Sequence, residues 1–407
     1  MEIKSLPPYI CLEFETERSF LDGKMQIAAY YFPNYHRDER NEAFHGEGWT
    51  EWELLKCARP RFAGHRQPRI PLWGYRDEAD PAVMAQKIDA AADHGIDAFV
   101  FDWYWYDGPY LQRALDEGFL RAPNRDRIKF ALMWANHDWH DKHPVSFANA
   151  TNAPVLYPWT NTPENIGTVW DYIIGRYFTS PSYWFVNGKP YFSIYAVKRF
   201  ISQMGGTANT AKVLALLREK AADAGLPGVH INAVSFDNLD NRPFCESAVI
   251  LEAEGVGFDS FTSYNSAGAT SVWREKFPRV DYAEAAREYL DFAAPLIGGL
   301  PVPYYPVVTS GWDSSPRTIQ SDTYRYGVYP FMPVMEPEEG PFAKLLSDLK
   351  RLTGRYGDEN RIIFINAWNE WTEGSYLEPD TYNGYKFLEI IKKQKTESGN
   401  AEVQRKG

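Results

Sequence analysis

Eight short apolar runs, separated by stretches with helical periodicity, constrain the fold of this 407-residue chain more than any other feature. Each run is almost continuously apolar, which is typical of parallel strands covered by helices on both faces. Because each run is followed by a helix or by a connection long enough to hold one, the pattern predicts an α/β fold, a (β/α)8 TIM barrel. The runs occupy residues 27–32, 97–105, 129–135, 191–196, 230–236, 258–264, 305–312 and 362–368.

The intervening stretches carry helix start and stop signals. Pro81 begins a helical pattern that Gly95 ends, and similar patterns cover 211–225, 282–296 and 341–357. The connection at 237–257, between the fifth and sixth strands, has the weakest helical signal. A doubly wound open sheet shows the same alternation, but no Gly-rich phosphate fingerprint follows the first strand, where the sequence reads YYFPNYH.

No linker, repeat or low-complexity tract divides the chain. Its length fits one long barrel or two ordinary domains. We expect a single catalytic barrel over residues 1–395 and a disordered tail over 396–407, where KTESGNAEVQRKG lacks the apolar residues needed for packing. The sequence does not indicate an oligomeric state.

Charge and hydropathy exclude several classes of partner. The net charge is −11 and no Lys/Arg-rich stripe is present, so we expect neither nucleic acid nor an anionic membrane surface as a partner. No apolar run reaches 18 residues, so no membrane span is expected. The first residues lack the apolar core of an export signal, which predicts a cytoplasmic protein, or a periplasmic or secreted one if a signal has been removed.

Neither a metal nor an organic cofactor is expected. Cys11, Cys57 and Cys245 are too far apart to indicate a disulfide framework or zinc-ligand spacing, and the eight histidines form no H-x-x-x-H or H-x-H cluster. No phosphate-binding loop is visible. The chain is, however, 16% aromatic. Aromatic faces suit the C–H faces of sugars, although large cores also use them.

Two connections, 34–80 after the first strand and 136–162 after the third, are too long to be simple turns. Long loops at the carboxyl ends of barrel strands build active-site walls, so we expect the site there. Glu51 in the first loop is equally consistent with a sugar ligand and with a loop anchor, and Tyr195 and Tyr264 with a core layer or the site. The expected substrate-binding residues are Tyr31, Tyr35, His36, Trp49, Glu51, Asp102, Tyr104, Trp134, Asn136, Trp312, Asp313, Asn369 and Trp371.

The strongest candidates for catalysis are Glu370 and Glu373, in the segment WNEWTEG after the last strand. Glycosidic cleavage needs one carboxyl group to protonate the leaving oxygen and another to assist at the anomeric side. Residues three apart face opposite sides of an ideal strand, but both can face one cavity if the chain turns just after Asn369. The alternative is that the two acids cap a helix or pair with an arginine.

These motifs resemble the WbsX-type family, which is related to glycoside hydrolase family 99, the endo-α-mannosidases. The resemblance covers residues 26 to 390 and is carried by WNEWTEG with the following YLEPD, by YYFPNYH and GEGWTEWELLKCARPRFAGHRQPRIP, and by WANHDW. It implies that Glu370 deprotonates the substrate 2-hydroxyl and that Glu373 is the general acid/base. The implied mechanism is retaining and passes through an anhydro-sugar. We expect burial and the charge of Glu370 to raise the pKa of Glu373, and Asn369 with Tyr31 or Tyr35 to keep Glu370 ionised.

The chain also departs from the family pattern. His137 and Asp138 follow WAN where the family usually has an acid, and Asp102 and Trp103 stand where tyrosine and histidine are common. Both changes lie where substrate is expected, so the identity of the sugar does not carry over.

Three functions remain open from the sequence. A glycoside hydrolase acting on an α-linked glycan fits best. A glycosyltransferase in surface-polysaccharide biosynthesis is the alternative, although no D-x-D motif is present. A non-catalytic glycan-binding protein is the third, and retention of both Glu370 and Glu373 argues against it.

Overall fold

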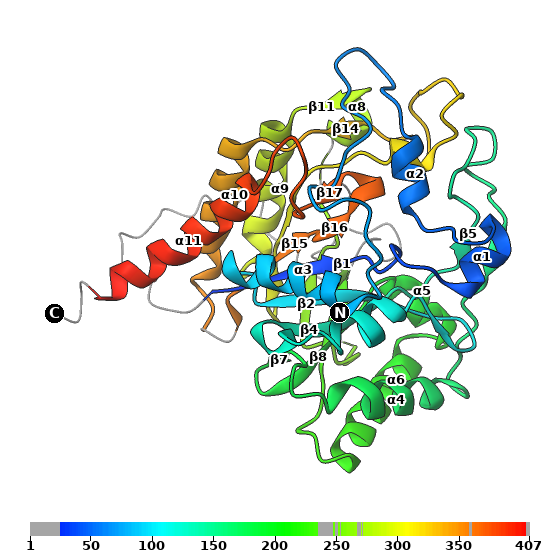
Figure 1. Cartoon of the computed structure of the whole chain (residues 1–407). Helices are drawn as coiled ribbons and strands as arrows, with labels where there is room; N and C mark the ends of the chain where they lie inside the picture. The colour runs from blue at the N-terminus through cyan, green and yellow to red at the C-terminus, as the bar shows by residue number, and fades with distance from the viewer. Residues whose placement is uncertain are drawn as a thin grey trace, which may run out of the picture.

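A ring of parallel strands forms the centre of the protein (Figure 1). The computed structural model describes residues 25–403, except 235–246, 249–250, 253, 267–269, 271 and 358–359. Strands lie in all eight regions predicted from the sequence. They are β1 (Gln26–Tyr31), β2 (Ala98–Trp105), β4 (Lys129–Trp134), β8 (Lys189–Ile194), β9 (His230–Val234), β10 (Ser260–Thr262), β12 (Tyr304–Tyr305) with β13 (Val307–Thr309), and β15 (Ile362–Asn366).

The seventh strand is divided into two short strands, β12 and β13, and together they close the barrel. Pro306 separates β12 from β13, because proline has no N–H to donate to a strand ladder. β12 pairs with β10, and β13 pairs with β15. The remaining order is β10-β9-β8-β4-β2-β1-β15, with every pairing parallel. The predicted (β/α)8 barrel is therefore confirmed.

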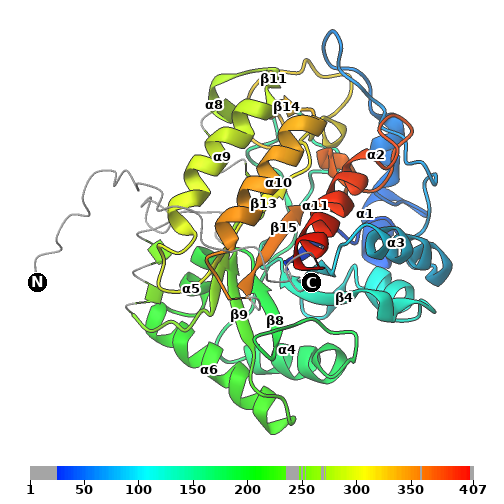
Figure 2. The same ribbon diagram turned by 90° about the vertical axis from the view of Figure 1, so that its left-hand side faces the viewer.

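Helices cover the outside of the ring. The four predicted helices correspond to α3 (Pro81–Asp93), α6 (Thr207–Asp223), α9 (Tyr282–Leu296) and α10 (Glu339–Thr353). Asp80 caps α3 by accepting a hydrogen bond from the Ala82 N–H, and Asp281 caps α9 in the same way. Figure 2 shows α9, α10 and α11 (Lys386–Val403) side by side over β13 and β15, with α4 (Ile166–Ile173) and α6 near β8 and β9.

Two regions discussed in the sequence analysis lie partly outside the described residues. Most of the weak connection at 237–257 lies outside them. Helix α11 continues to Val403, past residue 395, where we expect the barrel to end; residues 404–407 lie outside the described part. The division of the chain into 1–395 and 396–407 stays a prediction.

Both long loops contain short elements. The loop after β1 carries α1 (Glu39–His45) and α2 (Trp52–Cys57), and the loop after β4 carries the pair β5 (Trp139–His140) and β6 (Val155–Tyr157). The other helices are α5 (Val197–Gln203) and α8 (Val272–Glu275), and the other strands β3 (Pro109–Tyr110), β7 (Phe185–Val186), β11 (Arg279–Val280), β14 (Val334–Met335), β16 (Asn369–Glu370) and β17 (Ser375–Tyr376). Single 3-10 or π turns cover Ala114–Phe119, Arg125–Arg127, Ile174–Phe178, Ser315–Arg317 and Trp371–Glu373.

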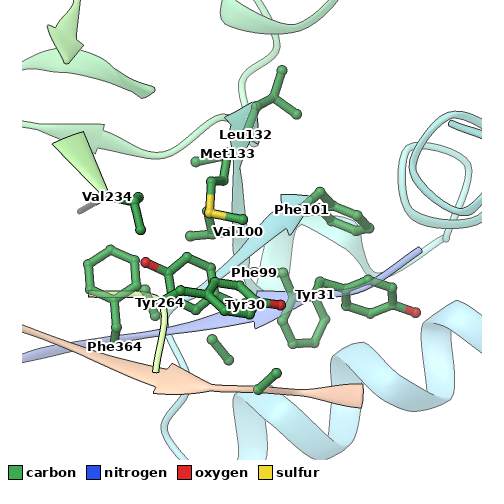
Figure 3. Close-up of a cluster of buried hydrophobic side chains, with 14 of the residues drawn as sticks. Tyr30, Tyr31, Phe99, Val100, Phe101, Leu132, Met133, Val234, Tyr264 and Phe364 are labelled. Atoms are coloured by element: carbon green, nitrogen blue, oxygen red, sulfur yellow. The ribbon is translucent and has the colours of Figure 1, made fainter. Parts of the chain in front are cut away.

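Aromatic side chains fill the barrel interior. The Tyr30 ring lies 4.8 Å from that of Tyr264 and 5.1 Å from that of Phe364, between centroids (Figure 3). The next residue, Tyr31, points away from this group and stacks on Phe101 at 4.5 Å. This alternation along β1 separates side chains that fill the barrel from those that face the helices. Within the described residues, no helix combines the length and apolar character needed to cross a membrane.

Candidate active site

The chain turns sharply where the last barrel strand ends. After β15, residues Asn369–Glu370 pair with Ser375–Tyr376 as a hairpin, and a 3-10 turn over Trp371–Glu373 joins the two strands. Gly374 adopts φ 64°, and a Cβ atom at this position would lie only 2.6 Å from Asp313 Cβ. Glycine therefore permits both the turn and its close approach to the loop after β13. As expected from the sequence, this turn brings Glu370 and Glu373 to the same place.

One arginine binds both of these glutamates. Arg317 Nη2 donates to Glu370 Oε2 at 3.3 Å, and Arg317 Nη1 donates to Glu373 Oε1 at 2.5 Å. Its Nε donates to Glu51 Oε1 at 2.8 Å. Arg317 follows β13 and is 5% exposed. We call Arg317, Glu51, Glu370 and Glu373, together with the nearby Asp102 of β2, the Arg317 cluster.

Tyrosine hydroxyl groups supply further hydrogen bonds to the pair. Tyr264, just after β10, donates to Glu370 Oε1 at 3.0 Å. Tyr329, in the loop that precedes β14, donates to Glu373 Oε1 at 2.7 Å. Each glutamate therefore has one tyrosine and one shared guanidinium as hydrogen-bond donors.

Glu51 reaches the cluster from the long loop after β1. Its carboxylate accepts a hydrogen bond from Asn34 Nδ2 at 2.6 Å, and another from the hydroxyl of Thr372. Burial alone would raise the pKa of Glu51, but the charge of Arg317 and the hydrogen bonds bring it below its usual value. Glu51 is thus the carboxylate that balances the charge of Arg317.

The other carboxyl groups of the cluster hold protons more strongly than usual. Burial raises the pKa of Glu370 well above its normal range, and the neighbouring charge of Glu373 adds to the effect. Burial also raises the pKa of Glu373, opposed by Arg317 and Tyr329. Burial therefore raises the pKa of Glu373 as expected, but the neighbouring charge that adds to it is that of Glu51 and not that of Glu370. Burial thus opposes the ionised form that we expect for Glu370, while Arg317 favours it.

Asp102 is a third buried carboxyl group with a raised pKa. It lies on the carboxyl-terminal half of β2 and is 5% exposed. Burial raises its pKa well above the usual value, partly offset by a hydrogen bond from Tyr264 to Asp102 Oδ2 at 3.2 Å. Among the described residues, Asp102 Oδ1 has no hydrogen-bond partner.

Further aromatic residues surround the cluster. Tyr35 packs on Trp52 at 4.1 Å, and its hydroxyl accepts a hydrogen bond from the Thr372 N–H at 3.3 Å. Tyr104 has a pKa raised by burial and then by the charges of Asp102, Tyr106 and Glu370. The structure therefore places Tyr35 and Tyr104 beside the carboxyl groups, as expected.

Three of the expected residues point away from the glutamates. The Asn369 amide accepts from the Phe32 N–H and donates to the Phe32 carbonyl and to Glu78 Oε1. Tyr31 faces Lys87, whose Nζ lies 5.6 Å from the centroid of the Tyr31 ring. Trp371 Nε1 donates to Glu378 Oε2 at 2.6 Å. The expectation that Asn369 or Tyr31 supports Glu370 is wrong, because side chains alternate along a strand.

Other expected residues have structural partners. Asp313 accepts hydrogen bonds from His65 Nε2 at 2.8 Å and from Gln67 Nε2 at 2.6 Å, so it anchors the loop after β1. Burial would raise the pKa of Asp313, but these contacts hold it below the usual range. The Asn136 amide binds both backbone groups of Ala196, which ties the end of β4 to that of β8.

The remaining four expected residues lie at differing distances from the glutamates. Trp134 packs between Trp170 of α4 and Phe200 of α5, away from them. His36 is fully buried, which lowers its pKa to about 3. Trp49 is half-buried and stacks on His45 at 4.2 Å. The Trp312 ring lies 6.5 Å from that of Tyr329.

The expected site residues do not include Arg317, Tyr329 or Thr372, although the sequence places Arg317 close to the end of the seventh expected strand. Arg317 follows the expected seventh strand in GWDSSPR, and its place after a strand end is the signal that could have identified it. Tyr329 sits in a loop without such a signal. Within the described part of the chain, no group of three or more His, Cys, Asp or Glu residues could hold a metal ion.

Solved structures with this architecture include enzymes of glycoside hydrolase family 99. The chain superposes on the endo-alpha-mannosidase of that family from Bacteroides thetaiotaomicron with a TM-score of 0.56 and 15% sequence identity, covering 93% of this chain and 98% of the other. A protein described as glycoside hydrolase-like gives a TM-score of 0.57 at 14% identity, covering 96% of this chain and 97% of the other. At such identities the likeness concerns the fold.

The sequence itself is similar to a longer bacterial protein. The uncharacterized protein WxcX of Xanthomonas campestris pv. campestris is 26% identical over 390 residues, which cover 91% of this chain and 49% of that protein. The chain thus spans about half the length of the curated relatives it matches. A family model described as glycosyltransferase WbsX matches residues 27–391. The chain therefore belongs to the WbsX family.

Proposed function

We propose that this protein is a glycoside hydrolase that cleaves an α-linked glycan, with Glu370 and Glu373 as its acid/base pair. One observation carries the proposal: two buried glutamates, both with raised pKa, share the guanidinium of Arg317. Groups that share a partner this closely titrate as a pair, so one proton can stay on the pair after the other has left. A pair that can both give and accept a proton is what glycosidic cleavage requires.

In the proposed reaction, Glu370 takes the proton of the substrate 2-hydroxyl, and the 2-oxygen attacks the anomeric carbon. The bond to the leaving oxygen breaks as Glu373 donates its proton to that oxygen. Water then opens the anhydro-sugar with the roles of the two glutamates reversed, so the anomeric configuration is retained. The raised pKa of Glu370 makes it a stronger base, closer to the optimum for work near neutral pH.

The charge of the Arg317 cluster favours a hydrolase over a transferase. Four carboxyl groups, those of Glu51, Asp102, Glu370 and Glu373, accompany one guanidinium. With one proton on the Glu370 and Glu373 pair and another on Asp102, two negative charges face one guanidinium, and the unbalanced charge would repel the diphosphate of a nucleotide-sugar donor. A neutral oligosaccharide or polysaccharide meets no such repulsion. We therefore propose a glycan substrate bound between Asp102, Tyr104, Tyr35 and Trp312, with Trp49 on the outer wall.

The family description names a glycosyltransferase, so the test covers both reactions. We expect hydrolysis of aryl α-glycosides or of members of a polysaccharide library, with the product released as the retained anomer in nuclear magnetic resonance spectra. A 2-deoxy substrate should not turn over, and azide should not rescue Glu370→Ala. Turnover with nucleotide sugars alone would show a transferase, and binding without turnover would show a glycan-binding protein.

No divalent ion is expected to take part in this reaction. Treatment with EDTA should therefore leave hydrolysis unchanged. Loss of activity with EDTA and its return on addition of a divalent ion would contradict this part of the proposal.

A further inference from the structure

The hydroxyl group of Tyr264 lies between two buried carboxyl groups. Its oxygen is 3.2 Å from Asp102 Oδ2 and 3.0 Å from Glu370 Oε1. A phenol carries a single hydrogen, so it can donate fully to only one of them. If both carboxyl groups were ionised, one buried contact would lack a full hydrogen bond, and an unsatisfied buried acceptor costs about 1–3 kcal/mol. The three groups are best satisfied when they share a second hydrogen.

The other contacts of the two carboxyl groups indicate where that hydrogen resides. Glu370 also faces the guanidinium of Arg317, which favours its ionised form. Among the described residues, Asp102 has no such cationic partner in direct contact, and its Oδ1 has no hydrogen-bond partner. A protonated Asp102 can donate to the Tyr264 oxygen, and Tyr264 can then donate to Glu370. Each short contact then contains one hydrogen.

The surroundings of Asp102 agree with a neutral group. The titratable and charged side chains that face it are Tyr30, Tyr104, Tyr264, Glu370, Glu373 and Arg317. The tyrosines bring no positive charge, the glutamates oppose a further negative charge, and Arg317 is already bound to three carboxylates. Burial favours the protonated form, Glu373 adds to this effect, and the hydrogen bond from Tyr264 and the charge of Arg317 offset it only in part.

We propose that Asp102 is a positioning residue: as a neutral carboxylic acid, it donates to Tyr264 and thereby fixes Tyr264 as a hydrogen-bond donor to Glu370. The fixed donor stabilises the ionised form of Glu370 against the effect of burial. The catalytic role of these two hydrogen bonds rests on the proposed function of Glu370 as the base. The protonation of Asp102 does not depend on that function, and it can be measured without any substrate.

Infrared spectroscopy tests the protonation directly. Protein labelled with ¹³C-aspartate should show an isotope-shifted band of a protonated carboxyl group at neutral pH, and Asp102→Asn should lack it. Absence of the band from the parent protein, or its persistence in Asp102→Asn, would overturn the proposal. Because this measurement needs no turnover, it separates failure here from failure of the proposed hydrolase activity. If the variant does not fold, absence of the band from the parent spectrum still overturns the proposal.

The pH profile of kcat/KM tests the consequence. In Asp102→Asn the amide N–H replaces the acid as donor to Tyr264, so the acid limb of the profile should stay at the same pH, whatever the change in rate. Tyr264→Phe removes a hydrogen bond to a charged group, which should lower kcat/KM about 10-fold or more and move the acid limb to higher pH. Asp107→Asn, at an exposed aspartate beyond β2, is the matched control.

Opposite results would assign a different state to Asp102. If it is ionised, its charge raises the pKa of Glu370, and Asp102→Asn should move the acid limb to lower pH. That shift would refute the neutral acid. A residue with a purely structural role would leave the acid limb in place in both variants, so an unmoved limb in Tyr264→Phe would also refute the proposal.

Discussion

The protein contains two buried clusters, each with glutamates around one cation, on opposite sides of β16. The Arg317 cluster faces the mouth of the barrel. The second, which we call the Lys87 cluster, lies behind it and joins Lys87 of α3 to Glu78 and to Glu378, the latter at 2.5 Å. Asn369 and Glu370 are neighbours in β16, yet Asn369 contacts the Lys87 cluster and Glu370 the Arg317 cluster.

The two clusters differ in the donors that complete them. In the Lys87 cluster, the N–H groups of Asn369, Trp368 and Trp371 donate to the glutamates at 2.9, 3.0 and 2.6 Å. Amide and indole N–H groups do not exchange donor and acceptor roles. The Arg317 cluster instead uses the hydroxyl groups of Tyr264 and Tyr329, which can do so. Fixed donors suit a structural anchor, whereas hydroxyl donors and surplus acids suit proton transfer.

The largest effect is expected from Glu370→Gln, which removes the proposed base from the Arg317 cluster. Removal of a general acid or base typically costs about 10²–10⁴-fold in rate. Because the base acts on the 2-oxygen, the loss of kcat should be the same for poor and for activated leaving groups. The matched variant Glu378→Gln, in the Lys87 cluster, should keep kcat near that of the parent. Equal losses in both variants would remove the functional distinction between the clusters.

Lys87→Met should break the second cluster without disturbing the chemistry. It leaves two buried glutamates without their cation, and loss of one partner of a buried ion pair costs about 3–5 kcal/mol of stability. Urea unfolding followed by circular dichroism measures this loss, and kcat per folded molecule should stay near the parent value. A variant that is stable but inactive would place Lys87 in the catalytic machinery.

Glu373→Gln should show a loss that depends on the leaving group. Glu373 is the proposed proton donor, so glycans with poor leaving groups should lose about 10²-fold in kcat/KM, within the range for a missing general acid. Activated aryl glycosides need little protonation and should lose much less. Steady-state rates across a series of aryl leaving groups measure the difference. A loss independent of the leaving group would reassign the acid, with Asp102 the next carboxyl group to test.

The smallest effect concerns stability and pH. Because the pKa of Glu370 is raised in the folded protein, the folded state binds more protons than the unfolded state, and stability falls as pH rises above the unfolded pKa of about 4.3. Glu370→Gln cannot ionise. It should therefore be more stable than the parent at pH 8, by about 0.5–2 kcal/mol, and this difference should vanish below pH 4. A constant difference at all pH values would contradict the raised pKa.

The fold follows from the sequence more completely than the site does. The apolar runs and the signals at Pro81 and Gly95 are local, so strands and helices could be predicted from short windows. The contacts of Arg317 with Glu51 and Glu370 join residues 266 and 53 positions apart, and no periodicity encodes them.

The direction of each side chain is a second feature of the site that the sequence does not predict. Neighbouring residues of a strand face opposite sides, and a shift of one residue in register exchanges them. Tyr31 is expected at the site but faces Lys87 on the helix side, whereas its neighbour Tyr30 points into the barrel beside Tyr264, which contacts Glu370. Trp371, in the turn after β16, is also expected at the site but contacts Glu378.

The wide separation in sequence of Glu51, Arg317 and Thr372 has a consequence for biosynthesis. Glu51 belongs to the loop after the first strand, and its contacts to Arg317 and Thr372 span 266 and 321 residues. Domains dominated by such non-local contacts fold slowly, because closing long loops precedes any gain from the contacts. On the ribosome, the first βα units emerge long before their partners exist. The Arg317 cluster therefore assembles only when the segment that carries Glu370 and Thr372 joins the first strand, so a chain that stops before this segment lacks the cluster.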